Sequence, residues 1–501
     1  MLACDQKAKL NKKIRNIREK NVFVYHLDEI EGTPILRPLL KSLRKLEPNT
    51  TGTIFLFASP RIVLKNEEVK NTVHHLLRKK ILRLISYDEI HLFHHYGRSF
   101  RSEFANIHEI FPTKERQLLM TATCNNAILN SCELLFNNTI SHRVWGNNID
   151  QEMRTVSFEI YYNTKPNYAV FDKIVEKLSI DNNSKVIVYA NTRTRVDEFE
   201  IYSENKFDAI GTEENKLHTI DVVKVYGPLT VEEKGDNLFT FMNKSTANYN
   251  PRVLVATSGA SNAGIDSDSI YGVYRLDMPP NRIDIVQERG RAGRFEDATP
   301  QQCHYCVYFS ISTFEYKLIQ INSKKEKVID ETYREEMEDE LLETLKLLII
   351  SHKCISQSLE VMLSNPHEDI NIEYSNRCDH CFVCKRSIIG RKFKKVELTA
   401  LLFGIFSDPE ILKNNLTSDL ITKVIRSKKE CCKSVFNVTN LKVSDIEATL
   451  LVLIAAGLVG WSIEKDEKGK EFVTLNLLKE KSKFKIQIDD AWSVIPERYF
   501  H

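Results

Sequence analysis

The sequence lacks several features that would assign it to a class directly. Its 501 residues contain no apolar run near the roughly 20 residues of a membrane-spanning helix, and the first residues have no apolar signal core. Neither charge dominates, because 70 Lys and Arg stand against 68 Asp and Glu. We therefore expect no membrane partner, and any surface for nucleic acid must be a local one.

The length and composition set the broad class. A chain of this length exceeds one ordinary core, which predicts two to four domains. Its 42% hydrophobic and 28% charged residues are typical of a globular protein. The 11 cysteines come without secretory features, so they indicate free thiols and metal ligands in a reducing compartment.

The most informative run is 287–294, which reads Gln-Glu-Arg-Gly-Arg-Ala-Gly-Arg. The guanidinium groups of Arg291 and Arg294 are always charged and suit a phosphate in transfer, and the glycines let the main chain approach a ligand. Gly-Arg repeats also occur in flexible RNA-binding tails, but this run lies within a patterned globular segment. It resembles motif VI of superfamily 2 helicases, Q-x-x-G-R-x-G-R, and fills every fixed position.

Two acidic residues follow a predicted buried strand in the first part of the chain. Strands are expected at 53–60 and 81–87, and their alternation with helical patterns predicts a parallel sheet, whose ligands gather at the strand carboxyl ends. Asp88 and Glu89 stand at such an end. Asp88 could hold Mg²⁺ through water, and Glu89 could orient or deprotonate an attacking water. A solvated acidic pair is the other interpretation.

The surrounding residues favour the catalytic interpretation. The run 88–91, Asp-Glu-Ile-His, resembles the DEAH form of helicase motif II and makes His91 a further candidate. The next segment resembles the aromatic-rich loop of RecQ helicases, which couples single-strand binding to hydrolysis. Its candidate nucleic-acid contacts are Tyr96, Phe100 and Arg101.

The resemblance continues into a second strand–helix series. A predicted strand at 118–123 ends in Thr-Ala-Thr and resembles motif III, which links the nucleotide and nucleic-acid sites. The run 185–193 is similar to RecQ motif IV and adds Asn191 and Arg193 as candidate nucleic-acid contacts. A polar surface insertion is expected at 204–219.

A further predicted strand, 253–257, leads into a loop that resembles motif V. Such loops contact backbone phosphates through hydroxyl and main-chain N–H groups, which makes Thr257 a candidate contact. The resemblance implies that Gly264 and Asp266 help to bind the nucleotide. After motif VI, Cys303 and Cys306 lie in an apolar strand pattern, which favours buried core cysteines over a metal or redox pair.

A cluster of cysteines follows an acidic helical stretch at 331–343. Cys354 is separated by 23 residues from a Cys-x-x-Cys-x-x-Cys run formed by Cys378, Cys381 and Cys384. Four thiolates in this arrangement can close a tetrahedral zinc shell. The spacing also begins a ferredoxin-like iron–sulfur motif, but the fourth Cys with its proline is missing. The position of the cluster resembles the RecQ zinc-binding subdomain.

The last third adds a basic run and a further domain. Lys392, Lys394 and Lys395 make either a phosphate-binding patch or a solvated basic face. From Val396 onward, three helices and a hairpin resemble the winged helix that RecQ proteins carry here. A capping box at 444–447 is expected to open a helix that Gly457 ends. That helix is almost wholly apolar, which favours the core over base reading. Hairpin strands are expected around Trp461 and Phe472.

The fold class expected is therefore α/β, with two RecA-like lobes built on parallel sheets, the first incomplete, followed by a helical zinc-binding subdomain and a winged-helix domain. The expected boundaries are residues 1–145 for the partial first lobe, 146–325 for the second lobe, 326–390 for the zinc-binding subdomain, 391–480 for the winged helix and 481–501 for a tail.

The RecQ resemblance covers roughly residues 20 to 480 and implies an ATP-dependent 3′ to 5′ DNA helicase acting in replication, recombination or repair. It implies ATP, Mg²⁺ and Zn²⁺ as cofactors, single-stranded and junction DNA as partners, and a nuclear location, or the cytoplasm in a prokaryote. Asp88, Arg291 and Arg294 would also bind the nucleotide. The catalytic candidates are Asp88, Glu89, His91, Gln287, Arg291 and Arg294.

One element of that activity is missing from the sequence. No G-x-x-x-x-G-K-[ST] phosphate-binding loop occurs anywhere, and in the family this loop precedes motif II by more sequence than stands before Asp88. The chain is therefore expected to begin between motifs Ia and Ib, as a truncated gene model or a fragment. The alternatives are a non-enzymatic zinc and winged-helix DNA-binding scaffold, and an RNA helicase, which the zinc and winged-helix order disfavours.

Overall fold

The computed structural model places most of the chain in two compact units, with the main boundary between Trp145 and Gly146; two short later segments group with the first unit. The residues described are 21–96, 106, 116–136, 140, 142–145, 155–162, 166–179, 183–210, 220–242, 251–257, 265, 267, 269–323, 331–351, 354–363, 378–389, 417–427 and 443–478. None of the helices in these ranges combines the length and hydropathy needed to span a bilayer.

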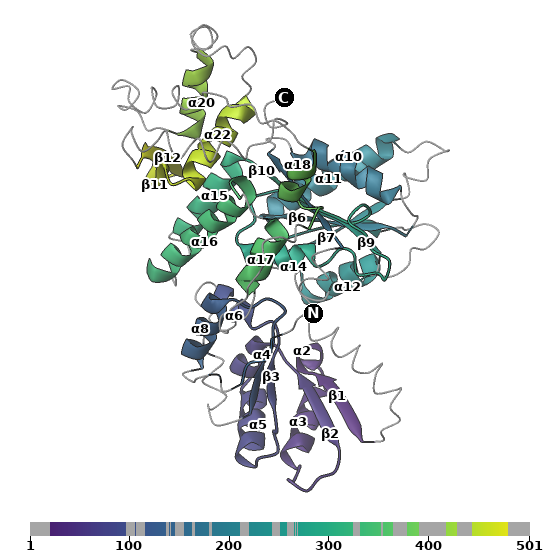
Figure 1. Cartoon of the computed structure of the whole chain (residues 1–501). Coiled ribbons are helices and arrows are strands. Elements are labelled where there is room, and N and C mark those ends of the chain that lie inside the picture. Colours follow the sequence, from purple (N-terminus) through teal and green to yellow (C-terminus); the bar gives the residue numbers. More distant parts are fainter. Residues whose placement is uncertain are drawn as a thin grey trace. The chain divides into compact units, whose positions relative to one another are not determined.

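The first unit is built on two pairs of parallel strands with helices between them (Figure 1). Strand β1 pairs with β2, and β3 pairs with β4. The elements in chain order are β1 (Val22–His26), α2 (Leu27–Ile30), α3 (Leu36–Arg44), β2 (Thr53–Phe57), α4 (Pro60–Lys65), α5 (Glu67–Arg78), β3 (Ile85–Tyr87), α6 (His91–Tyr96), β4 (Gln117–Leu119) and α8 (Asn126–Leu135).

The second unit is built on a six-stranded sheet in the order β5-β10-β9-β6-β8-β7, and all its pairings are parallel. Its elements up to the sheet's last strand are β5 (Ser157–Tyr162), α10 (Pro166–Leu178), β6 (Lys185–Ala190), α11 (Arg193–Ile210), β7 (Asp221–Val225), α12 (Val231–Met242), β8 (Pro251–Thr257), β9 (Ile270–Arg275), α14 (Arg282–Arg289) and β10 (His304–Phe309). The later elements are α15 (Ile311–Asn322), α16 (Glu331–Ile349), α17 (Ile355–Leu363), α18 (Phe382–Ile389), α20 (Ser418–Ser427), α22 (Val443–Ala455), β11 (Val459–Lys465) and β12 (Glu471–Leu477).

Both faces of the six-stranded sheet are buried. Helices α10 and α11 pack on one face, where Phe171 and Phe199 join Val188 and Tyr274 in one core cluster. Ile187, on the opposite face of β6, is 0% exposed as well. Strands covered on both sides tolerate continuous Val and Ile runs, which explains why β6 and β8 were recognisable from the sequence. The expected α/β fold with a parallel sheet is confirmed.

Three predicted strands are shorter than expected, for local reasons. The expected strand 53–60 stops at Phe57 because Ser59 caps α4, with Pro60 as its first residue. The expected strand 81–87 begins only at Ile85, because the N–H groups of Ile81 and Leu82 donate to Leu76 O and close the end of α5.

The third, expected at 118–123, ends at Leu119. The hydroxyl of Thr121 there donates to Thr123 O and accepts from Thr123 N–H, which turns the chain away from the sheet. The expected surface insertion 204–219 was also partly wrong. Its first seven residues extend α11 to Ile210, and Phe207, 1% exposed, anchors them in the core.

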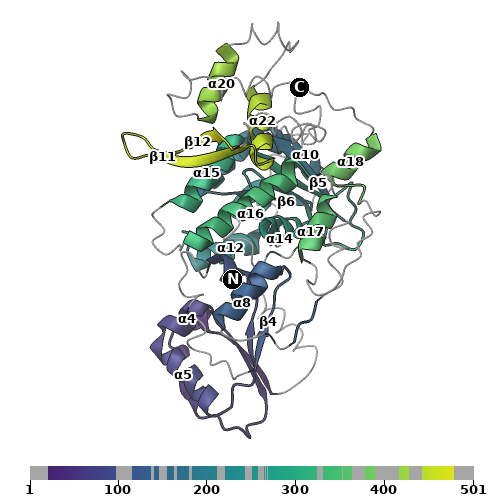
Figure 2. The same cartoon turned by 60° about the vertical axis from the view of Figure 1, so that its left-hand side comes forward.

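The C-terminal helix and hairpin form as expected. Helix α22 is largely buried and supplies core residues, and Gly457, at φ +66°, ends it in a left-handed turn. Strands β11 and β12 form an antiparallel hairpin, which lies beside α15 (Figure 2), where Phe314 contacts Trp461 edge-on. The capping box was wrong: α22 begins at Val443, so Ser444 lies inside it.

The side chain of Glu447 has another role, since it accepts a 2.6 Å hydrogen bond from the Tyr162 hydroxyl at the end of β5. This bond ties α22 to the six-stranded sheet. Two helices and the hairpin of the expected winged helix are described, whereas residues 428–442 between them are outside the described ranges. The winged-helix assignment stays a prediction.

Candidate active site and metal centre

Asp88 and Glu89 lie at the carboxyl end of β3, in a turn fixed from two sides. Glu89 has φ +52°, a conformation that residues other than glycine seldom adopt and that is often found at functional sites. Its N–H donates to Asp88 Oδ1 at 2.9 Å. The next N–H, of Ile90, donates to Met120 O at 2.9 Å and ties the turn to the end of β4. Both carboxylates are half-buried.

His91 connects this turn to the Thr-Ala-Thr segment after β4. Its Nδ1 lies 2.9 Å from Thr121 Oγ1 and 3.2 Å from Glu89 Oε2. Since the Thr121 hydroxyl donates its hydrogen to Thr123 O, its oxygen can accept a hydrogen bond from the His91 ring. The contact with Glu89 is an ion-pair distance rather than a hydrogen bond, because Oε2 has no hydrogen-bond donor among the described residues. The structure thus brings together the segments that resemble motifs II and III.

The electrostatics of the acidic turn suit a bound cation. Burial, followed by the charge of Glu89, raises the pKa of Asp88 above its usual value. Loss of solvation and repulsion between two carboxylates both disfavour the ionised form. A divalent cation held by Asp88 would offset both effects.

In the second unit, α14 presents the arginine run. Asn281 caps the helix by accepting a 2.7 Å hydrogen bond from Asp284 N–H. After the helix, Arg291 is buried and its Nη1 donates to Ile265 O at 2.9 Å, in the segment that resembles motif V. Arg294 is exposed, and its Nε donates to Gly290 O at 2.7 Å. Of the two arginines expected to bind phosphate, only Arg294 presents an exposed side chain.

Gly293 is required by the path of this run. Its φ is +67°, and a Cβ at this position would lie 3.0 Å from Val156 Cγ2 and 3.3 Å from Thr155 Oγ1. Its N–H donates to Ile270 O at 3.1 Å. Any side chain here would push the run away from the start of β5 and β9.

A buried network behind α14 was not foreseen from the sequence. Arg275 and Glu288, both 0% exposed, form an ion pair of 2.6 Å, and the Tyr305 hydroxyl donates to Glu288 at 3.0 Å. Arg275 also donates to Asn191 Oδ1, and Asn191 Nδ2 donates to Met278 O at 3.0 Å. The amide of Asn191 is thus committed to the protein. The available signal was a lone acid, Glu288, inside an otherwise basic run.

The other predicted site residues lie on several elements or outside the described residues. Gln287 is buried in α14, and Thr257 ends β8. Arg193 is 59% exposed at the start of α11, ion-paired with Asp197 at 3.4 Å. Tyr96 is the last residue of α6. The remaining ones lie outside the described residues: Phe100, Arg101, Gly264, Asp266, Lys392, Lys394 and Lys395.

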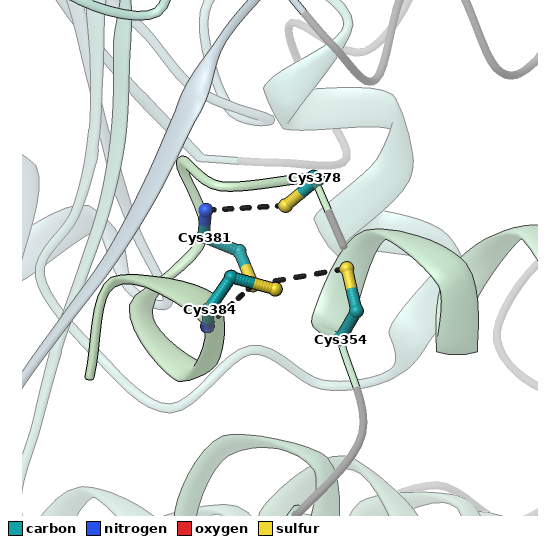
Figure 3. Close-up of side chains that lie close together, drawn as sticks. All are labelled: Cys354, Cys378, Cys381 and Cys384. Carbon is teal, nitrogen blue, oxygen red and sulfur yellow. Dashed lines mark hydrogen bonds between the residues drawn. The ribbon is translucent and has the colours of Figure 1, made fainter. Parts of the chain in front are cut away.

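The four predicted metal ligands converge in the second unit (Figure 3). The sulfur atoms of Cys354, Cys378, Cys381 and Cys384 all lie within 4.8 Å of one another, and none forms a disulfide. The sulfurs of Cys381 and Cys354 are 3.9 Å apart. Zn–S bonds of about 2.3 Å in a tetrahedron place sulfurs about 3.8 Å apart, so the cluster has the dimensions of a four-thiolate metal site.

The local structure favours thiolates at two of the four positions: sharing hydrogen bonds within the cluster lowers the pKa of Cys354 and Cys378 and raises that of Cys381 and Cys384. The Cys381 N–H donates to Cys378 Sγ at 3.2 Å, and the Cys384 N–H donates to Cys381 Sγ at 3.4 Å. Cys354 immediately precedes α17, and Cys384 lies in the first turn of α18, so both face helix N-termini. The hydrogen bond with Cys354, followed by those with Cys381 and Cys384, lowers the pKa of Cys378.

A second group of metal-type donors is of another kind. Glu159, His304 and Cys306 bring their ligand atoms together on the sheet. However, Lys177 Nζ lies 3.1 Å from His304 Nε2, and Lys385 Nζ lies 3.3 Å from Glu159. Because ammonium groups already contact two of the three donors, the group fits an internal polar cluster better than a metal site. Cys303 and Cys306 are both 0% exposed, so the expectation of buried core cysteines is confirmed.

Comparisons with known proteins converge on helicases. Residues 169–296 match the family described as "Helicase conserved C-terminal domain". The chain is 24% identical over 200 residues to eukaryotic initiation factor 4A of Caenorhabditis elegans, covering 40% of this chain and 44% of that protein. It is 26% identical over 195 residues to the DEAD-box ATP-dependent RNA helicase CshA of Bacillus licheniformis, covering 39% of this chain and 36% of that protein.

Among solved structures, the Mycobacterium smegmatis helicase Lhr bound to ssDNA and AMP-PNP is 14% identical with a TM-score of 0.44, and the similarity covers 98% of this chain and 53% of that chain. The chain spans less than half the length of the two curated relatives named above. The name of CshA describes a DEAD-box RNA helicase, and neither relative supports the finer RecQ assignment. The family match and the sequence relatives support a helicase C-terminal domain in the second unit.

Proposed function

We propose that this chain acts as an ATP-dependent DNA helicase of RecQ type, which moves 3′ to 5′. The observation that carries the helicase part is the turn after β3, where Asp88 and Glu89 are joined through His91 to Thr121, at 2.9 Å. That link connects an acidic pair suited to phosphate chemistry to the end of the neighbouring strand β4. A change at the acidic pair during hydrolysis can therefore be transmitted to the segment after β4. The arginine run after α14 lies inside the matched helicase domain and supports the same proposal.

Each residue has a proposed role. Asp88 would hold Mg²⁺, which would neutralise phosphate charge, and Glu89 would orient the attacking water and take its proton. Arg294, exposed after α14, stabilises charge that develops on the transferred phosphate. Arg291 is buried and donates to Ile265 O, so it positions the run or reorients when the nucleotide binds. Zn²⁺ would be held by Cys354, Cys378, Cys381 and Cys384 and would fold the segment around them.

DNA rather than RNA is proposed on the strength of the region after the matched domain. The cysteine cluster and the C-terminal hairpin follow residue 296 in the order expected of the RecQ resemblance. RNA unwinding is the second candidate, and the names of the sequence relatives favour it. Both candidates share the acidic turn and the arginine run.

The test compares nucleic acids on one protein. Because these 501 residues contain no G-x-x-x-x-G-K-[ST] loop, hydrolysis is expected only when a helicase first-lobe segment with a Gly-rich Lys-Thr loop is joined before Met1. That protein should hydrolyse ATP faster with single-stranded DNA than with RNA of the same sequence, and it should unwind 3′-tailed duplexes. Equal or greater stimulation by RNA supports the second candidate. No stimulation by either nucleic acid, with the loop present, contradicts both.

A further inference from the structure

Arg289, the last residue of α14, carries a guanidinium group deep in the second unit. It is 1% exposed and ranks among the largest fully buried side chains described. Its Nη1 donates to Ser356 Oγ at 3.0 Å, and its Nη2 donates to Val156 O at 2.6 Å. The guanidinium carbon lies 5.7 Å from the centre of the Phe158 ring. Arg289 is therefore held by groups from β5 and α17.

Two of these contact residues also lie next to the cysteine cluster, one beside Cys354 and the other beside Cys381. Ser356 lies in the first turn of α17, two residues after Cys354. Phe158 forms an isolated parallel bridge with Cys381, and its N–H donates to His380 O at 3.4 Å. The guanidinium thus lies where the arginine-bearing helix meets the segments that carry Cys354 and Cys381.

Charge explains why a guanidinium is buried at this point. A buried cation is costly unless an anion is near. Arg275, the other fully buried arginine in the described core, has the carboxylate of Glu288 at 2.6 Å. For Arg289, burial lowers the pKa, and the thiols of Cys378, Cys381 and Cys354 are foremost among the groups that raise it. Four thiolates around one divalent metal ion carry a net charge of −2, so a loaded cluster is an anion.

We propose that Arg289 is the counter-cation of a metal–thiolate centre formed by Cys354, Cys378, Cys381 and Cys384, and that through it this centre positions the run 290–294. The inference rests on the zinc site of the proposed function. When the metal leaves, the guanidinium loses most of the negative charge beside it, and the end of α14 is no longer held. Arg289 is a positioning residue: the metal acts on Arg294 through it.

The first test measures Zn²⁺ affinity by competition with a chromogenic chelator. Arg289→Met keeps a chain of similar volume and removes the charge, and it should weaken Zn²⁺ binding about 10- to 100-fold, the range typical of partners outside the ligand shell. Arg289→Lys keeps the charge and should recover part of the loss. The matched control is Arg282→Met, at the other end of α14, which removes an ion pair with Glu340 of 2.7 Å and should leave Zn²⁺ affinity unchanged.

The second test uses the unaltered chain, so it does not depend on a variant that folds. Removing Zn²⁺ with a chelator should speed amide hydrogen exchange in residues 286–294 as well as around the cysteines, while β6 stays protected. Equal Zn²⁺ affinities for Arg289→Met and Arg282→Met overturn the proposed counter-cation. Unchanged exchange at 286–294 after Zn²⁺ removal overturns the coupling to the arginine run.

These outcomes separate the inference from the proposed function. A chain that purifies without zinc and binds none contradicts the zinc site, and the inference falls with it. If Arg289→Met loses Zn²⁺ affinity, the proposed counter-cation is supported. If, in addition, no nucleic acid stimulates ATP hydrolysis by the protein that carries the phosphate-binding loop, the helicase proposal is contradicted. Cobalt(II) serves as a spectroscopic check, because its thiolate absorption reports whether the four-sulfur site still forms in each variant.

Discussion

The two units hold the charges of their candidate sites in different ways. In the first unit, Asp88 and Glu89 are half-buried at the end of a three-residue strand, where Asp88 accepts from the Glu89 N–H and Glu89 lies 3.2 Å from His91. In the second unit, Glu288 and Arg289 are buried behind a six-stranded sheet and bonded on several sides, while Arg294 is exposed. We therefore propose that charge in the acidic turn mainly serves chemistry, whereas around α14 most of it holds structure.

The largest expected effect tests the acidic turn. Glu89→Gln should lower nucleic-acid-stimulated ATP hydrolysis by about 10²- to 10⁴-fold, because the amide cannot take a proton from water. Nucleotide binding and the thermal unfolding midpoint should stay as in the parent, since the Glu89 side chain makes few contacts. The assay uses the protein that carries the added phosphate-binding loop. Near-normal turnover in Glu89→Gln would mean that Glu89 does not activate the attacking water, despite the resemblance to motif II.

The second prediction tests the expectation that the buried charges around α14 stabilise the fold. Glu288→Gln leaves Arg275 charged and buried without its carboxylate, which should lower the free energy of unfolding by about 3–5 kcal/mol in denaturant titrations. The double variant Arg275→Met, Glu288→Met removes both charges and should recover most of that loss. If Glu288→Gln unfolds like the parent, the network does not stabilise the second unit, and the contrast between the units disappears.

The contrast also explains what the sequence could reveal. Strands β6 and β8 were predictable because burial on both faces leaves continuous apolar runs. The lengths of the strands expected at 81–87 and 118–123 were overestimated. The first residues of 81–87 close the end of α5, and the last residues of 118–123 form a threonine turn. Asp88 and Glu89 were found because they follow a strand end.

The roles of Glu288 and Arg289 could not be found in the same way. Arg289 bonds to Ser356, 67 residues away, and no local pattern encodes such a pairing. A charged residue in a helical run looks the same in a sequence whether it faces solvent or a buried partner. The spacing of the four cysteines did indicate that they gather, because thiols spaced in this way can close a four-ligand metal shell.

A third prediction concerns pH in the second unit. Burial raises the pKa of Glu315 in α15 to about 7, and the charges of Asp419 and Glu447 act in the same direction. The folded state thus binds this proton more tightly than the unfolded chain. Protonation of Glu315 therefore stabilises the folded state. This contribution is complete below the usual carboxyl pKa, near 4.5, and is lost as the pH rises through 7.

Glu315→Gln should therefore raise the free energy of unfolding at pH 8 by about 1–3 kcal/mol and leave it nearly unchanged at pH 4.5. Denaturant titrations at the two pH values measure the difference. Part of the pH dependence should persist in the variant, because burial raises the pKa of Glu447 too. A parent protein whose stability does not fall between pH 5 and 8 would contradict the prediction, as would a variant that is less stable at pH 8.

The smallest effect is expected for a charge pair in the first unit, and it completes the contrast with Glu288. Lys79 and Glu47 form an ion pair of 2.7 Å, but their side chains are 37% and 64% exposed. Solvent screens such a pair, and ordering two long side chains offsets most of the attraction. Lys79→Met should change the free energy of unfolding by less than about 1 kcal/mol, and the change should shrink further in high salt. A loss as large as that of Glu288→Gln would show that exposed charges hold the first unit together, and the proposed division between chemistry and structure would then be wrong.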